Sequence, residues 1–200
     1  GVKYVPKDMP LVLTAAVYQL TKDKNLTADP NNASFSIQTG EIRSRGIELE
    51  AKAAVNANIN VTASYTYTDA QYQHDTTFNG KRPAEVPRNM ASLWADYTFH
   101  ETALSGLTVG AGARYVGSTV SYYKNDTSTG KKDDSFNVAG YALMDATVKY
   151  DLARFGLPGS SIGVNVNNLF DREYVSSCYS EYACYWGAER QVVATATFRF

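Results

Sequence analysis

The chain ends in Gly187–Phe200, which reads GAERQVVATATFRF. Apolar residues occupy every second position here, and mostly polar residues lie between them: the apolar set is Val192, Ala194, Ala196, Phe198 and Phe200. A period of two predicts a β-strand with one apolar and one polar face. A terminal phenylalanine closing such a strand is typical of outer-membrane β-barrels, whose last strand pairs with an earlier one and leaves no open edge in lipid. We therefore expect Phe198 and Phe200 to form a barrel-assembly signal.

The same alternation recurs along the chain, in the segments 11–20, 47–53, 59–68, 93–99, 107–115, 142–150 and 162–166. With the last strand this gives about eight strands of about ten residues, long enough to cross a bilayer when tilted. The sequence predicts an all-β fold, a transmembrane antiparallel β-barrel. Gly1–Val5 is expected to be the end of a further strand, and Pro6–Pro10 a short periplasmic turn.

The expected connections alternate in length. Short ones fall at 55–58, 100–106 and 153–160, and long polar ones at 21–40, 73–88, 118–137 and 171–187. Barrels of this kind have short periplasmic turns and longer extracellular loops. Because the last strand ends at the periplasm, the four long connections are expected to be extracellular.

Composition agrees with a membrane β-protein. The 200 residues are 44% hydrophobic and 20% charged with net charge −1, so no basic excess indicates a nucleic-acid partner. The mean hydropathy is low, at −0.32, because half of the residues in each alternating strand are polar and the long loops are polar as well. The 15 tyrosines are typical of interfacial aromatic girdles. We expect outer-membrane lipid and lipopolysaccharide to surround the barrel.

Charged residues fall on the predicted inner face: Glu48, Glu50, Lys52, Asp96, Arg114, Asp145 and Lys149. An eight-stranded barrel has a lumen just wide enough for side chains, and burying unpaired charges there is costly. A wider barrel that holds water or a plug accommodates them. The inward-facing Gly110 and Gly112 are expected to leave space in the lumen.

Two cysteines, Cys178 and Cys184, lie in the last extracellular connection and are expected to form a disulfide. A metal pair is the weaker alternative, because two ligands without a histidine make a poor site. Tyr179, Tyr182, Tyr185 and Trp186 lie between and beside the cysteines. They could form a ligand-binding wall or a small hydrophobic core that packs the loop, and the sequence leaves both readings open.

Enzymatic chemistry is not expected. His74, next to Asp75, lies in an outer connection and His100 lies at a periplasmic turn, so the two cannot share a site. A barrel hydrolase would need a base beside a nucleophile or a metal ion. We predict no catalytic residue and no metal site, and we expect the charged cluster Lys131–Asp134 to be a solvated loop tip.

A family resemblance rests on Asn167–Tyr174, which reads NNLFDREY and is expected to be a strand crossing the outer interface. Together with the final strand, it resembles the C-terminal end of TonB-dependent siderophore receptors. Gly46–Glu50 (GIELE), Ser64–Asp69 (SYTYTD), Val86–Met90 (VPRNM) and the cysteine pair are similar to the ferric-hydroxamate, ferrichrome-type branch.

The resemblance implies a barrel of about 22 strands around a plug, of which residues 1–200 would be the C-terminal part, without the plug domain. It implies energised import of a ferric siderophore, which is cargo and not a cofactor, through contact between the plug's TonB box and the TonB complex. Tyr179, Tyr185 and Trp186 would bind the siderophore, and a phage or colicin could use the same receptor. The alternative is a small self-contained structural or adhesive barrel.

Overall fold

A computed structural model describes residues 1–29, 31–76, 78–101, 103–122 and 135–199. Its regular elements are thirteen strands among these residues and one 3₁₀ turn, Ala153–Phe155. The strands are β1 (Val2–Tyr4), β2 (Leu11–Asp29), β3 (Asn32–Ala54), β4 (Ile59–His74), β5 (Asn89–Thr98), β6 (Leu107–Val116), β7 (Thr119–Tyr122), β8 (Ser135–Val138), β9 (Tyr141–Asp151), β10 (Ser161–Asn167), β11 (Val175–Ser180), β12 (Ala183–Trp186) and β13 (Gln191–Thr197). No helix in the described part of the chain is long and apolar enough to cross a membrane.

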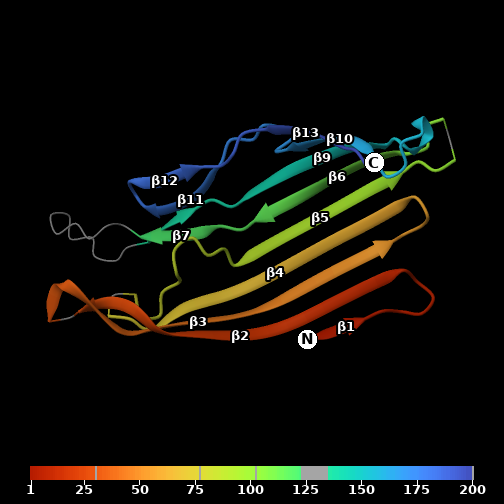
Figure 1. Cartoon of the computed structure of the whole chain (residues 1–200). Coiled ribbons are helices and arrows are strands. Elements are labelled where there is room, and N and C mark those ends of the chain that lie inside the picture. Colours follow the sequence, from red (N-terminus) through yellow and green to blue (C-terminus); the bar gives the residue numbers. More distant parts are fainter. Residues whose placement is uncertain (30, 77, 102, 123–134, 200) are drawn as a thin grey trace.

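Nine strands form one antiparallel sheet in the order β1-β2-β3-β4-β5-β6-β9-β10-β13 (Figure 1). A strand is present at every segment predicted from the alternation. The last strand pairs with β10, where Val192, Ala194 and Ala196 face Val166, Val164 and Ile162. This register places the apolar face of β13 on the same side as that of β10.

The registers align the apolar faces of neighbouring strands into one band. One row joins Val17 to Ile47 and Ile47 to Tyr67, and another joins Val109 to both Tyr97 and Val148. Large apolar side chains in this band are open to the surroundings; Val17, for example, is 75% exposed. A contiguous apolar face of this size suits the hydrocarbon region of a bilayer.

The three connections that were predicted to be short lie at the same end of the nine-stranded sheet (Figure 1). The turns at 55–58, 99–106 and 152–160 join neighbouring strands at the end that the sequence predicts to face the periplasm. At the first turn, Asn56 Oδ1 accepts hydrogen bonds from the backbone N–H groups of Asn58 and Ile59, both at 2.9 Å. Such a side-chain acceptor stabilises a tight turn. The β1–β2 connection (residues 5–10) lies at the same end.

One loop prediction is wrong. The segment 21–40 is not an irregular loop, because β2 runs for 19 residues and β3 for 23, so that the paired strands continue to Asp29 and Asn32. Beyond the bilayer both faces of a hairpin meet water, so neither face needs to be apolar. The period-two signal therefore fades while the strands continue.

Two other long connections carry strands of their own. Within 118–137 lie β7 and the start of β8, and within 171–187 lie β11 and β12. These four strands form a second sheet in the order β12-β11-β7-β8, in which Ser180 of β11 pairs in parallel with Tyr122 of β7. The buried apolar residues described are Ala70, Val138, Leu143 and Cys178, and all lie toward this outer end.

The inner face is polar, and the ring of Trp94 lies on it. A Cβ atom on Gly110 would meet Trp94 Cζ2 at 2.8 Å, and one on Gly112 would meet Trp94 Cε3 at 2.5 Å. The Trp94 ring thus lies across both glycines. The expectation that these glycines leave open space is corrected: they make room for an inward-facing tryptophan.

Candidate functional site

The β11–β12 hairpin carries the residues predicted to bind ligand. Cys178 and Cys184 lie directly opposite each other in the two strands and form the predicted disulfide. Cys178 is buried at 3% exposure, and the disulfide joins the two strands of the hairpin. A covalent crosslink inside a short hairpin limits the conformations that the loop can adopt.

The aromatic side chains around this disulfide are strongly exposed. Tyr179 is 72%, Tyr182 84% and Trp186 73% exposed, and Tyr185 is exposed as well. They therefore do not form the small hydrophobic core that was one reading of the sequence. Exposed aromatic rings on a braced loop provide a contact surface that loses little conformational entropy on binding.

The predicted ligand residues lie in different surroundings. Tyr179 precedes Ser180 of β11, which pairs with Tyr122 of β7. Trp186 instead lines a shallow depression together with Glu173, Tyr174 and Glu189. Tyr185 pairs with Ser177, and its carbonyl oxygen accepts a hydrogen bond from Ser176 Oγ at 3.0 Å.

An aromatic cluster at the outer mouth was not foreseen from the sequence. The Phe78 ring lies 5.7 Å from that of Tyr72 and 4.8 Å from that of Tyr122, centroid to centroid. The Lys81 ammonium lies 5.7 Å from the ring centroids of both Phe78 and Tyr122. The stretch 72–81 and the strand β7 thus meet here. The distance in sequence between these segments explains why no local motif reveals the cluster.

Tyr122 fixes the cluster to the loop after β4. Its hydroxyl donates a hydrogen bond to the Arg82 carbonyl oxygen at 2.6 Å, and burial raises the pKa of this phenol. Arg82 Nη2 in turn donates to the Val86 carbonyl oxygen at 2.9 Å. Because the phenol is the donor, its neutral form is the one that holds the loop.

The motif Asn167–Tyr174 is not the strand that was predicted, because β10 ends at Asn167. Asn168 and Asp171 adopt positive φ values of 51° and 55°, a region that asparagine and aspartate tolerate better than other non-glycine residues. Asn168 is 2% exposed. The motif therefore forms a turn around the buried Asn168, and this turn redirects the chain from the barrel wall into the outer loop.

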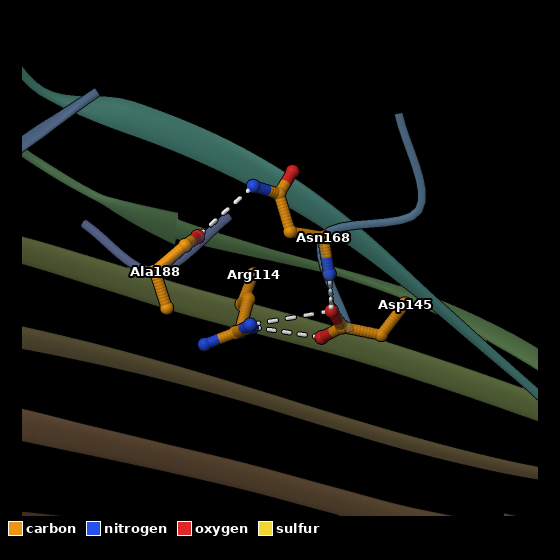
Figure 2. Close-up of polar contacts among 4 residues, drawn as sticks. All are labelled: Arg114, Asp145, Asn168 and Ala188. Carbon is orange, nitrogen blue, oxygen red and sulfur yellow. Dashed lines mark hydrogen bonds and ion pairs between the residues drawn. The ribbon is translucent and has the colours of Figure 1, made fainter. Parts of the chain in front are cut away.

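Asn168 ties three segments together (Figure 2). Its Nδ2 donates to the carbonyl oxygens of Arg172 at 2.9 Å and Ala188 at 3.2 Å, and its Oδ1 accepts from the Arg172 backbone N–H at 2.9 Å. Its own backbone N–H donates to Asp145 Oδ1 at 2.9 Å. The base of the loop is thereby held to β9 and to the segment that enters β13.

Arg114 completes this cluster from β6. Its Nε and Nη2 donate to the two carboxylate oxygens of Asp145 at 2.7 and 3.2 Å (Figure 2). A two-pronged arginine–carboxylate contact fixes orientation as well as charge. Asp145 therefore accepts from both the barrel wall and the turn. We name Arg114, Asp145 and Asn168 the loop-base cluster.

Further contacts lock the two ends of the outer loop. Arg172 Nη1 donates to the Ala142 carbonyl oxygen at 3.0 Å, and the Arg190 backbone N–H donates to Asp171 Oδ1 at 2.7 Å. Gly187 N–H donates to the Tyr174 carbonyl oxygen at 2.8 Å. The Tyr174 ring covers Gly187 so closely that a Cβ atom there would overlap it. The hairpin thus rises from a rigid base.

The other predicted residues are placed as follows. His74 Nδ1 lies 3.1 Å from Glu41 Oε2, whereas His100 Nε2 lies 3.0 Å from the Ala57 carbonyl oxygen at the opposite end of the sheet. Among the described residues, no group of three or more His, Cys, Asp or Glu side chains is placed to hold a metal ion. Phe198 is exposed just after β13. Phe200 and Lys131–Asp134 lie outside the described residues.

Comparison with known proteins gives one family. The family described as "TonB dependent receptor-like, beta-barrel" matches residues 1–169. The ferrichrome outer membrane transporter/phage receptor of Escherichia coli K12 is 60% identical over 200 residues, which cover all of this chain and 26% of that protein. The ferrioxamine B receptor of Salmonella typhimurium is 39% identical over 202 residues, covering all of this chain and 27% of that protein.

The fold is likewise shared with solved receptors. The ferric-catecholate import receptor Fiu of E. coli K12, in its closed form, superimposes with a TM-score of 0.73 at 26% identity over 99% of this chain and 26% of that one. The chain spans about a quarter of the length of these relatives. The proteins compared are receptors and transporters rather than enzymes. The chain belongs to the TonB-dependent receptor β-barrel family of the bacterial outer membrane.

Proposed function

We propose that residues 1–200 form the C-terminal part of an outer-membrane receptor that imports ferric hydroxamate siderophores of the ferrichrome type. The observation that carries the proposal is 60% identity, over the whole chain, to a ferrichrome transporter. The geometry agrees with a binding role, because an exposed aromatic hairpin stands on a rigid base at the outer mouth of the sheet. The ferric siderophore is the cargo.

In this proposal Tyr179, Tyr185 and Trp186 contact the siderophore. We assign the main contact to Tyr179, because it is 72% exposed and the next residue, Ser180, pairs with Tyr122 of the aromatic cluster. The disulfide and the loop-base cluster hold the hairpin in place before binding, which lowers the ordering cost of the bound state. Tyr182, at the tip of the hairpin, has no part in this contact.

Transport would depend on partners of the whole receptor. A plug domain would carry a TonB box to the inner-membrane TonB complex, and outer-membrane lipid with lipopolysaccharide would surround the barrel. Since the E. coli relative is named as a phage receptor as well, a phage or a colicin could dock on the same exposed loops.

The test is iron uptake by a receptor-null strain that carries the natural gene product containing these residues. We expect uptake of radioactive iron from ferrichrome and none from a ferric catecholate. Replacing Tyr179 by Ala should raise the half-saturating ferrichrome concentration about tenfold, equivalent to about 1.4 kcal/mol. Tyr182→Ala, an equally exposed tyrosine of the same hairpin, is the matched control and should leave uptake unchanged.

Uptake from the catecholate alone would contradict the proposed substrate class. Equal effects of Tyr179→Ala and Tyr182→Ala would instead contradict the assigned role of Tyr179, while leaving the substrate class intact.

A further inference from the structure

One asparagine–glycine pair occurs in the chain, Asn79–Gly80, and it lies in the loop between β4 and β5. The side-chain carbon Cγ of an asparagine can be attacked by the backbone nitrogen of the following residue. A Cβ atom on that residue hinders the attack, and glycine carries none. Of all the asparagines in the sequence, Asn79 is therefore the one whose neighbour hinders this reaction least.

Asn79 and Gly80 are both exposed to solvent. A Cβ atom built on Gly80 would meet no other atom within 4 Å, so the space beside the glycine is open. Water therefore reaches the pair. Exposed loop tips of this kind are also where proteins tolerate change most readily.

The pair occupies the two central positions of a β-turn. The Lys81 backbone N–H donates to the Phe78 carbonyl oxygen at 2.8 Å, and Gly80 adopts a φ of 76°. A positive φ at the third residue is what a type II turn requires, and glycine adopts it without strain. The turn thus favours a glycine at this position, and that glycine leaves Asn79 with an unhindered neighbour.

The reacting nitrogen is engaged elsewhere while the turn is closed. The Gly80 N–H donates to the Tyr72 carbonyl oxygen at 2.7 Å, and the Tyr72 N–H donates to the Lys81 carbonyl oxygen at 2.9 Å. Ring closure needs the Gly80 nitrogen to lose its proton, and this hydrogen bond retains it. Tyr72 lies near the end of β4 at His74, and hydrogen bonds at an exposed strand end open at a lower free energy than those of the central sheet. The reaction therefore proceeds from a locally opened turn.

We propose that Asn79 is a deamidation site whose rate is set by the opening of this turn. The Gly80 nitrogen forms a bond to Asn79 Cγ, the side-chain amide takes up the Gly80 proton and leaves as ammonia, and a succinimide ring remains. Water then opens the ring at either carbonyl group. Attack at Cγ restores the backbone and gives aspartate, whereas attack at the backbone carbonyl gives isoaspartate. The balance needs only water, and the inference does not depend on which siderophore the receptor carries.

The products change the aromatic cluster beside the turn. Both add a carboxylate near Lys81, whose ammonium lies 5.7 Å from the ring centroids of Phe78 and Tyr122. Isoaspartate also lengthens the backbone of the turn by an additional carbon atom, so the Phe78 carbonyl and the Lys81 N–H no longer meet at hydrogen-bond distance. We expect the Phe78 ring to lose its fixed place between Tyr72 and Tyr122.

The test follows the natural gene product, purified in detergent and incubated at physiological temperature in neutral and in mildly alkaline buffer. Mass spectrometry of its peptides detects the mass change that exchange of an amide for a carboxyl group produces, and fragmentation separates aspartate from isoaspartate. We expect both products at Asn79, formed faster in the alkaline buffer because ring closure needs the loss of a proton. Asn31, an exposed turn asparagine followed by Asn32, is the internal control and should remain unmodified.

Two variants separate the chemistry from the turn. Asn79→Gln places a further methylene between the backbone and the amide, which disfavours ring closure, and should form no product. Phe78→Ala keeps both reacting residues but removes the ring that packs against Tyr72 and Tyr122, and should speed deamidation. An unstructured peptide of residues 75–83 should react about tenfold faster than the receptor, which corresponds to about 1.4 kcal/mol for opening the turn.

An unmodified Asn79 in the receptor, after an incubation that converts the free peptide completely, would overturn the proposal, and so would equal modification of Asn31. Equal rates in the receptor, the Phe78→Ala variant and the free peptide would overturn the assigned control of the reaction by the turn.

Discussion

At the scale of single residues, Asn168 has the largest expected effect. Its buried amide makes three hydrogen bonds and its backbone adopts a positive φ of 51°. Asn168→Ala removes the side-chain bonds and leaves buried backbone groups unpaired, which should cost about 2–4 kcal/mol. Urea unfolding of the receptor in detergent measures the loss.

Asn60→Ala is the control for this prediction. The Asn60 amide donates one bond, to Asp96 Oδ2 at 3.0 Å, and that site is exposed. We expect a change below about 1 kcal/mol for this variant. If both variants unfold at the same urea concentration, Asn168 does not hold the base of the loop.

The motif around Asn168 stood out in the sequence because it resembles a receptor family, but the sequence did not predict the turn that the motif forms. The partners of Asn168 are Asp145, Arg172 and Ala188, and only Arg172 is close in sequence. Tyr72, Phe78 and Tyr122 likewise meet only through the fold. Contacts of this kind depend on loop paths that a local pattern does not specify.

At the scale of elements, the disulfide hairpin should be ordered by its crosslink. The ring closed by Cys178 and Cys184 spans six residue steps. Replacing both by Ser should therefore lower local stability by about 2 kcal/mol, since short rings remove little chain entropy. Hydrogen exchange of β11 and β12 should quicken, while the urea midpoint of the barrel stays nearly unchanged.

Thiol labelling of the non-reduced native protein provides a direct check of the crosslink, because neither cysteine should react. A large fall in the urea midpoint of the double Ser variant would show that the disulfide stabilises the whole sheet. That result would contradict a purely local role of the disulfide.

Elements inside the bilayer were predictable and those outside it were not. Between Ile59 and Tyr67 the lipid demands an apolar residue at every second position, so alternation reveals the strand. Between Thr21 and Asp29 water lies on both sides, and β2 continues without that pattern. The small strands β7, β11 and β12 were missed because they are short and lie in polar loops.

At the scale of the whole molecule, the nine-stranded sheet forms one wall with β1 and β13 at its two edges among the described residues. We propose that these edges are continued by further strands of a larger plugged barrel. The inner face fits that proposal, because it carries charged side chains such as Lys52, Asp96 and Lys149. A tightly packed small lumen would bury such groups at a high cost.

Sidedness tests the account most directly, because binding at the hairpin requires that the long connections face the outside. Two exposed loop residues serve as probes: Asn79, after β4, and Ala57, in the β3–β4 turn. Each is replaced by Cys, and intact cells are treated with a membrane-impermeant maleimide. We predict labelling of the Asn79→Cys variant on intact cells and of the Ala57→Cys variant only after the outer membrane is permeabilised. Labelling of Ala57→Cys on intact cells, with Asn79→Cys protected, would contradict the account.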